Sequence, residues 1–314
     1  MSERGRSVII NEVGLRDGLQ NQTVDVRTDD KIELADLLIS AGVRHFEAGS
    51  FVSPRAVPRM ADSPEVFVRL GGREGVELSA LIPNEKGYER ARQVGVRSVA
   101  VVLSATETMN QKNIRMSLEK TRRVCTSIVA RARADGVIAN GYVAVAFECP
   151  YEGSVAPDSV MELTGELFDA GADRAIIADT IGAANPEQTY RLFKDLAREY
   201  GTERLAAHLH DTRALGVANA WAALHAGIRR FDSSIGGLGG CPFAPGAAGN
   251  VATEDLVLMF EQCGWTTGIE VDLLLPAVDK AGWITKQKLG GRALPWFRNR
   301  KKNLQVRKSS GTEK

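Results

Sequence analysis

The sequence predicts a (β/α)8 TIM barrel with a short C-terminal extension, and three observations carry that prediction. Short apolar runs alternate with amphipathic segments of helical length, which is typical of a parallel sheet covered by helices. Eight such units follow one another, and eight strands close as a TIM barrel, whereas a doubly wound sheet usually has fewer. The length of 314 residues suits one barrel, whose typical size is about 250 residues.

The eight expected strands are near-continuous apolar runs at residues 7–15, 44–49, 76–82, 98–104, 137–149, 174–180, 204–211 and 230–238. Helix-like stretches lie between them at residues 29–40, 85–93, 117–134, 157–170, 186–200 and 218–226. Glycine recurs just past the helix ends, as at Gly42, Gly95 and Gly171, where a left-handed cap needs no Cβ. Pro186 stands where a first-turn proline is expected.

Composition excludes several classes of function. The chain is 44 % apolar with a formal net charge of +1, so nothing global points to nucleic acid or an anionic membrane. Its four cysteines form no C-x-x-C pair, which argues against a zinc ribbon and favours reduced thiols in the cytosol. No apolar run is long enough for a signal peptide or a membrane span. We expect a soluble, cytoplasmic protein that binds neither nucleic acid nor membrane and forms a homo-oligomer, a dimer or higher.

The chain is expected to divide into a catalytic barrel, residues 1–283, and a basic tail, residues 284–314. The tail is interrupted by Gly and Pro and is only weakly periodic, so a partly disordered, solvated tail is the favoured interpretation over a binding arm.

Two of the four histidines, His208 and His210, stand two residues apart in the seventh expected strand. Residues i and i+2 of a strand point to one face, so the two imidazoles should project together near the C-terminal mouth of the barrel, where active sites of this fold lie. A single barrel histidine is more often a hydrogen-bonded core residue. Two on one face at a strand end favour metal binding.

Barrel closure brings the first and eighth strands next to the seventh or one position away, so further ligands are expected there. Asp17 stands at the end of the first strand and Asn250 precedes the eighth helix. With His208 and His210 they would supply two imidazoles, a carboxylate and an amide oxygen. That set suits a six-coordinate divalent cation with open positions, unlike a closed, thiolate-rich structural zinc site.

Several stretches resemble the 3-hydroxy-3-methylglutaryl-CoA lyases, within the wider group of metal-dependent TIM-barrel lyases and Claisen-type enzymes. The matching stretches follow family order from near residue 9 to about residue 270: EVGLRDGLQN, SFVSPRAVP, YVAVAFECPYEG, DTIG, HLHDT, DSSIGGLGGCPFAPGAAGN and ATEDL. RDGLQ with HxHD identifies the wider group. The GLGGCP loop, CPYEG and SFVSP are similar to the lyase more narrowly.

The resemblance implies cleavage of a 3-hydroxy-3-methylglutaryl thioester, or a close 3-hydroxy acyl-CoA relative, to acetyl-CoA and a 3-oxo acid such as acetoacetate. It implies a Mg²⁺ or Mn²⁺ ion that polarises the hydroxyl. Asp17 would be ligand and base with His208 assisting, and Arg16 would face the developing enolate charge. Cys241, in a glycine-rich loop, would give a proton to the departing enolate.

Other residues of the matching stretches have less specific expected roles. The resemblance places Gln20, Glu47 and Asp179 on the substrate side, and Cys149, at the expected end of the fifth strand, is a candidate for the same role or for packing. Glu254 either orients a ligand or favours the start of the eighth helix. Cys125 and Cys263, in helix-like segments, are expected to be structural.

The chain departs from the usual family sequence at several pocket-edge positions: Thr23 for lysine, Ala56 for tryptophan, Ala144 for serine, Glu148 for glycine, and Arg213-Ala214-Leu215 for Tyr-Gly-Gln. None belongs to the expected metal set. We interpret this as intact cleavage chemistry with a changed hold on an anionic, CoA-bearing substrate, and with a changed acyl group as one outcome.

Three alternatives stay open on sequence. A related TIM-barrel aldolase or Claisen-type enzyme would use the same metal set, but the short C-terminal region argues against a synthase with a regulatory domain. A non-haem iron oxygenase also uses two His and one Asp, but usually on a jelly roll. A non-catalytic, metal-stabilised barrel would have little need for Arg16, Cys241 and the glycine loop together.

Overall fold

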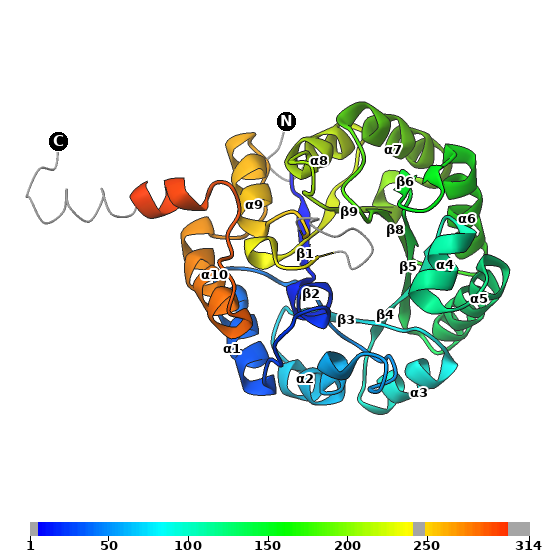
Figure 1. Cartoon of the computed structure of the whole chain (residues 1–314), viewed down its shortest axis with the longest axis horizontal. Coiled ribbons are helices and arrows are strands. Elements are labelled where there is room, and N and C mark those ends of the chain that lie inside the picture. The colour runs from blue at the N-terminus through cyan, green and yellow to red at the C-terminus, as the bar shows by residue number, and fades with distance from the viewer. Residues whose placement is uncertain (1–5, 241–248, 301–314) are drawn as a thin grey trace, which may run out of the picture.

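A closed barrel of parallel strands forms the centre of the molecule. The computed structural model describes residues 6–240 and 249–300. Across these ranges eight strands close in the order β1-β10-β9-β8-β5-β4-β3-β2, and the helices form a ring outside them (Figure 1). The predicted (β/α)8 architecture is therefore confirmed, with the N-terminal strand and the last strand hydrogen-bonded to each other.

The barrel strands are β1 (Ile9–Glu12), β2 (His45–Ser50), β3 (Glu77–Leu81), β4 (Ser98–Ser104), β5 (Ile138–Ala144), β8 (Arg174–Asp179), β9 (Leu205–Leu209) and β10 (Arg230–Ser233). The helices are α1 (Thr28–Ser40), α2 (Ser63–Leu70), α3 (Glu85–Gln93), α4 (Glu107–Ile114), α5 (Leu118–Ala134), α6 (Pro157–Asp169), α7 (Pro186–Tyr200), α8 (Gly216–His225), α9 (Thr253–Gln262) and α10 (Val271–Thr285). Short helical turns also occur at η2 (Gly14–Gly18), η3 (Pro58–Met60), η4 (Thr202–Arg204) and η5 (Ile235–Gly237).

Local sequence signals explain several helix starts. Asn185 accepts a hydrogen bond from the Gln188 backbone while the Gln188 side chain accepts one from Asn185 N, a capping box directly before Pro186. Asn84 and Ser117 cap α3 and α5 through their side chains. These polar caps satisfy amides that a helix start leaves without partners.

Three expected strands end well before their predicted ends: the first, the fifth and the eighth, which was expected to reach residue 238 but stops at Ser233 before the turn η5. The fifth was expected to run to Cys149, but β5 ends at Ala144, because Val145 adopts a positive φ of 50° and its amide bonds Thr180. Cys149 instead lies in a two-residue strand, β6 (Glu148–Cys149), antiparallel to β7 (Gly153–Ser154). The first was expected to reach residue 15 but stops at Glu12, where the turn η2 begins to form.

The core has two parts. Most buried apolar side chains fill the layer between strands and helices. A smaller cluster of Leu81, Ala100, Tyr142, Ile176 and Ala206 fills the barrel interior. The interior is therefore packed, as expected for this fold, and it supports whatever lies at the C-terminal mouth.

The segment after α10 packs on the barrel as far as it is described. Leu294 and Phe297 are buried, and Glu254 accepts hydrogen bonds from the amides of Gly236 and Gly291, so it joins the turn after β10 to this segment. Glu254 lies in the first turn of α9, but its carboxylate binds backbone amides of two other segments and not the histidines. Residues 301–314 of the expected tail lie outside the described ranges, and the division at residue 283 stays a prediction.

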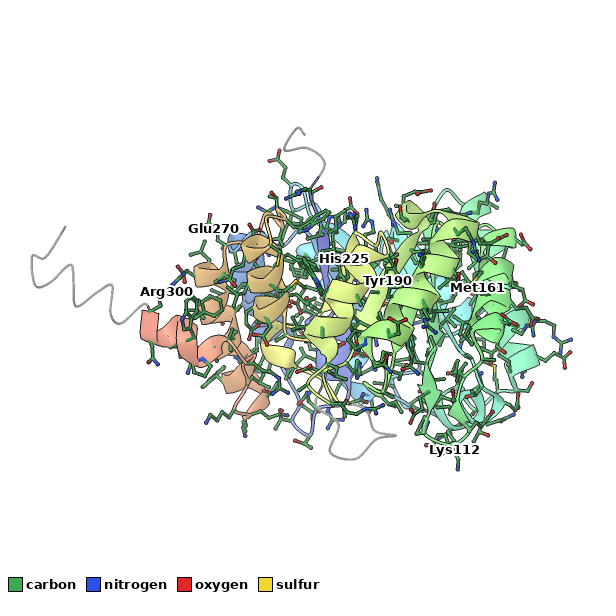
Figure 2. All side chains as sticks on the ribbon, turned by 90° about the horizontal axis from the view of Figure 1, so that it is seen from above. Lys112, Met161, Tyr190, His225, Glu270 and Arg300 are labelled. Carbon is green, nitrogen blue, oxygen red and sulfur yellow. The ribbon has the colours of Figure 1, made fainter. Side chains whose placement is uncertain are left out.

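Side chains cover the whole helical ring, and Figure 2 places Lys112, on α4, and Glu270, just before α10, at opposite ends of the barrel. Among the described residues, helices that combine the length and apolarity of a membrane span do not occur.

Candidate active site

His208 and His210 lie together at the C-terminal end of β9, as predicted. Their Nε2 atoms are 3.2 Å apart, and both side chains are buried. His208 is inside the strand, and His210 follows it in an isolated bridge with Asn250. The two-residue period of an extended chain therefore put both rings on one face.

Asp17 reaches the histidines from the helical turn η2, which follows β1. The amides of Asp17 and Gly18 both bond the carbonyl of Val13, and Gly14 N bonds the Glu12 carboxylate. Glu12 also accepts from Ile235 N and the Thr253 hydroxyl, so it fixes the start of the turn. The hydrogen bond from Gly18 N to Val13 O closes a π-helical turn, which has one residue more than an α-helical turn. This turn directs the carboxylate of Asp17 toward the histidines.

The chain after β10 returns to β9 and brings Asn250 to the same place. Val251 N bonds Leu209 O and Asp211 N bonds Gly249 O, which extends the ladder beyond the strand. Asn250 Nδ2 donates to Asp17 Oδ2 at 2.8 Å, while its Oδ1 is buried without a partner among the described residues. Asn250 therefore contacts the cluster through its amide nitrogen.

The donor atoms of Asp17, His208 and His210 suit one divalent cation. One ligand atom of each lies within 4.8 Å of the others. A carboxylate accepts a hydrogen bond from His208 Nδ1, which leaves His208 Nε2 facing His210 Nε2 within ligand reach of the Asp17 carboxylate. Burial and the neighbouring His208 lower the pKa of His210 to about 4, which keeps that imidazole neutral and able to bind metal.

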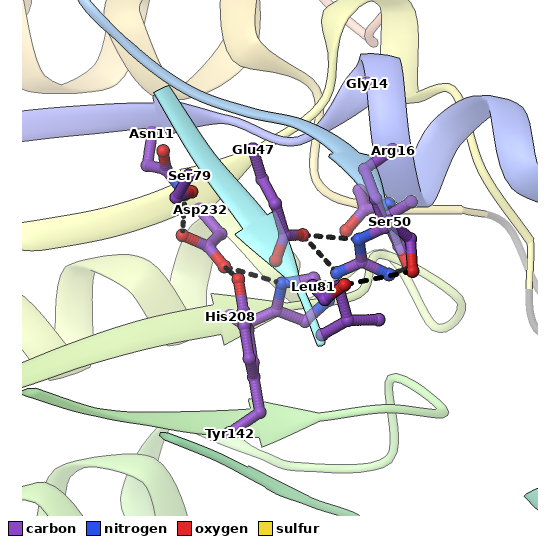
Figure 3. A network of polar contacts seen from close by, with 12 residues as sticks. Asn11, Gly14, Arg16, Glu47, Ser50, Ser79, Leu81, Tyr142, His208 and Asp232 are labelled. Atoms are coloured by element: carbon purple, nitrogen blue, oxygen red, sulfur yellow. Dashed lines mark hydrogen bonds and ion pairs between the residues drawn. The ribbon is translucent and has the colours of Figure 1, made fainter. Parts of the chain in front are cut away.

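Asp232 on β10 orients His208, and sequence reasoning missed it. Its carboxylate accepts from His208 Nδ1 at 3.0 Å, Tyr142 OH at 2.7 Å and Asn11 Nδ2 at 2.9 Å (Figure 3). Asn11, Asp232 and His208 are register partners across β1, β10 and β9. A carboxylate behind a metal-binding histidine fixes its tautomer and ring orientation. Its only sequence signal was an acidic residue inside an apolar strand.

Arg16 is buried between two carboxylates. Its Nε and Nη2 contact Glu47 Oε2 from β2 (Figure 3). Its Nη1 lies 2.5 Å from Asp17 Oδ1. Burial alone would lower the pKa of Arg16, but the charges of Glu47 and Asp17 raise it above its ordinary value. Burial likewise disfavours ionised Asp17, yet Arg16 and the two histidines hold its pKa below the usual range. A fixed positive charge therefore stands beside the cluster.

A cavity of about 270 Å³ opens above these groups. Arg16, Asp17, Gln20, His208 and His210 line one side of it. Cys125, which was expected to be structural, also lines it, and burial raises the pKa of its thiol to about 12. Its place in the cavity depends on how α5 packs on β4, which the helical pattern of residues 117–134 does not reveal.

Two predicted residues have their contacts outside the cavity, and a third is outside the described residues. Asp179 ends β8 and accepts hydrogen bonds from the amides of Ala183 and Ala184, while burial raises its pKa to about 6. Cys149 Sγ accepts a hydrogen bond from Thr106 at 3.1 Å and is not part of the cavity wall. Cys241 lies outside the described residues, although Gly240 before it lines the cavity.

Two of the positions that depart from the usual family sequence face each other. Arg213 Nη2 lies 3.7 Å from Glu148 Oε2, and Arg213 also donates to the carbonyls of Gly182 and Ala183. The two side chains are about half exposed, so this ion pair contributes little stability. It does offset the negative charge that Glu148 adds at the mouth.

Several known proteins are similar to this chain over most of its length. The HMGL-like family model matches residues 7–279. A hydroxymethylglutaryl-CoA lyase of Pseudomonas mevalonii is 41 % identical, over 91 % of this chain and 93 % of that protein. A 3-hydroxy-3-isohexenylglutaryl-CoA/hydroxymethylglutaryl-CoA lyase of Pseudomonas aeruginosa is 41 % identical, over 92 % and 96 %. An HMG-CoA lyase from Acinetobacter baumannii, solved with coenzyme A and 3-methylmalate, superimposes with a TM-score of 0.88 at 39 % identity, over 92 % and 94 %.

Proposed function

This chain belongs to the HMGL-like family, and from that premise we propose that it cleaves 3-hydroxy-3-methylglutaryl-CoA, or a close 3-hydroxy acyl-CoA relative, to acetyl-CoA and a 3-oxo acid such as acetoacetate. It is a carbon–carbon lyase, as are curated relatives about 40 % identical over most of its length. The observation that carries the proposal is the convergence of Asp17, His208 and His210 beside the buried Arg16.

The reaction asks for three things: loss of the tertiary hydroxyl proton, cleavage of a carbon–carbon bond, and protonation of the thioester enolate that leaves. A divalent cation, Mg²⁺ or Mn²⁺, held by Asp17, His208 and His210, and by Asn250 with its amide turned so that Oδ1 faces the site, would acidify the hydroxyl and stabilise its alkoxide. The residues around it orient the substrate, hold charge and move protons.

Asp17 is both a candidate ligand and the candidate base, with His208 assisting. The pKa of Asp17 is held below its usual range, so this carboxylate is a weak base towards an ordinary alcohol. Burial disfavours protonation of His208, but its hydrogen bond to Asp232 raises its pKa above the ordinary value. His208 would assist by its position beside Asp17, because Asp232 engages its Nδ1 and its Nε2 is the nitrogen offered to the cation.

Arg16 is the candidate for holding enolate charge. The guanidinium is fixed by Glu47 and Asp17 before substrate arrives, so little reorganisation is needed when charge develops. Cys241 is the candidate proton donor to the enolate carbon. The candidates for substrate binding remain Gln20, Glu47, Asp179 and Cys149. Gln20 lines the cavity, and Glu47 would influence the substrate by holding Arg16, which also lines the cavity.

We further propose a cytoplasmic homo-oligomer whose partner is an acyl-CoA substrate, with residues 1–283 as the catalytic domain and residues 284–314 as a tail. The lysine and tryptophan usual in the family are replaced by Thr23 and Ala56, both exposed here, so the hold on the CoA portion differs from that of the relatives.

The test is a panel of 3-hydroxy acyl-CoA thioesters and free hydroxy acids, among them a 4-hydroxy-2-oxo acid. Release of acetyl-CoA from the thioesters supports the proposal. Release of pyruvate from a hydroxy-oxo acid, with the thioesters left intact, would instead assign the chain to the related TIM-barrel aldolases or Claisen-type enzymes.

A further inference from the structure

The cavity above the cluster has two unlike sides. Its charged side, described above, comes from η2 and β9. The opposite side, formed by β4, α4, α5 and the connection between the helices, is mainly apolar. It consists of Val102, Met109, Ile114, Met116, Val124 and Cys125, with Asn113 and Thr121 as its polar members. The barrel-interior residues Leu81 and Tyr142 form the floor between the two sides. The site therefore offers charge and hydrogen bonds on one side and an apolar wall on the other.

The substituents of the reacting carbon can be assigned to these sides by their chemistry. The hydroxyl and the carboxylate arm belong on the charged side, beside Arg16 and Asp17. Coenzyme A is far larger than a cavity of about 270 Å³, so the thioester arm must leave through the open mouth. The remaining substituent is the apolar branch on C3, and the apolar wall is the surface left for it.

We propose that the natural substrate carries a C3 branch longer than methyl, an alkyl or alkenyl chain that lies against the wall formed by α4 and α5. This assignment rests on the proposed lyase function and narrows its substrate class. A single methyl would leave most of the wall facing water, whereas each further methylene buries more apolar surface. Met109 and Met116 have flexible thioether chains that adapt to different branch shapes.

Two other residues make this side more apolar. Ala144, at the end of β5, lines the cavity and presents only a methyl group to it. The thiol of Cys125 is directed to the carbonyl of Val102, and burial keeps it neutral, so it serves as a small apolar surface. No carboxylate, lysine or arginine interrupts the wall among the described cavity-lining residues of α4 and α5.

The experiment measures kcat/KM for 3-hydroxy-3-alkylglutaryl-CoA thioesters with straight branches of one to six carbons. We expect kcat/KM to rise along the series by about 10-fold or more, since one methylene in an apolar pocket changes it by about that factor. Val124→Phe fills the pocket from α5 and should reduce the ratio of the six-carbon to the methyl value by about 10-fold or more. If Val124→Phe impairs folding, Val124→Met is a milder variant for the same measurement. The control is Val68→Phe, at an exposed position of α2, which should keep the wild-type ratio of the six-carbon to the methyl kcat/KM.

Two results would overturn the assignment while leaving the lyase function in place. One is a kcat/KM that falls steadily as the branch grows beyond methyl. The other is an equal loss on every thioester in Val124→Phe, which would assign the wall to the pantetheine arm. If no member of the series is cleaved, both proposals fail together, and the free hydroxy acids of the earlier panel identify the reaction instead.

Discussion

The carboxylate of Asp232 accepts a hydrogen bond from His208 Nδ1 at 3.0 Å, and it accepts further hydrogen bonds from Tyr142 and Asn11. With the proton on Nδ1, the lone pair of His208 is on Nε2, which faces Asp17 and His210. The tautomer needed for metal binding is therefore fixed by a residue that does not touch the cation site.

Asp232→Asn should weaken metal binding and lower turnover by about 10- to 100-fold, because the amide can donate to Nδ1 and so favour the wrong tautomer. Tyr142→Phe removes only one of the bonds that hold Asp232 and should have a smaller effect. Mn²⁺ titration measures the affinity, and ¹⁵N NMR of the metal-free protein reports the tautomer of His208. An unchanged tautomer and affinity in Asp232→Asn would contradict the role.

Arg16→Lys should be nearly as damaging as Arg16→Gln, with losses in kcat of about 10²-fold or more. The planar guanidinium contacts Glu47 and Asp17 at once, and an ammonium cannot reproduce that fork. Arg16→Gln should also destabilise the fold by about 3–5 kcal/mol, because Glu47 stays buried without its partner. Steady-state kinetics and urea unfolding separate the two effects. Good retention of rate by lysine would leave only a point-charge role.

Removal of divalent metal by a chelator should abolish cleavage, and Mg²⁺ or Mn²⁺ should restore it. His210→Ala removes one of the converging ligands and should weaken Mn²⁺ binding. His225→Ala, an exposed histidine on α8, is the matched control and should bind Mn²⁺ like the wild type. Full activity of the chelated protein would exclude the mechanism.

Cys241→Ala should lower turnover far more than it changes the melting temperature, because the expected role of the thiol is proton donation to the enolate. Cys263→Ala, at the exposed end of α9, is the control and should leave both quantities unchanged. Thermal unfolding and kcat are measured on the same preparations. An unchanged kcat in Cys241→Ala would make the thiol a bystander.

Ionisation of the buried Glu12 carboxyl group should lower the free energy of unfolding as pH rises from about 5 to above 7. Burial raises its pKa from the ordinary 4.5 to about 7, against the hydrogen bonds from Thr253, Ile235 and Gly14. Between these values the folded protein keeps a proton that the unfolded chain has lost, so the free energy of unfolding falls with pH, by about 3 kcal/mol in all.

Glu12→Gln removes this titration and serves as the comparison for that pH effect. Urea unfolding at several pH values should show the wild type losing stability relative to the variant across this range. Parallel curves for the two proteins would contradict the raised pKa.

Much of the site follows from local rules that a sequence expresses. The alternation of apolar runs and helical segments predicts the barrel, and the period of two residues per strand repeat puts His208 and His210 on one face. Closure of an eight-stranded barrel brings the chain after β1 and after β10 next to β9, which is why Asp17 and Asn250 could be named as their neighbours.

The strand ends were less predictable. Cys149 was expected at the end of β5, but the strand ends five residues earlier, at Ala144, where Val145 adopts a positive φ. The Cys149 thiol instead accepts a hydrogen bond from Thr106. Apolar composition continued through this stretch, so periodicity gave no sign of the break. The conformation of a single residue decided it.

The sequence by itself determined the barrel, the end of it that carries the site, and the residues with metal-binding chemistry. Only the tertiary structure decided that Asp232 supports His208, that Cys125 faces the cavity, and that Glu148 meets Arg213. The reason is that these contacts join elements far apart in the chain, through strand register and helix packing. Each side chain's local pattern is compatible with several registers, and only the closed barrel selects one of them.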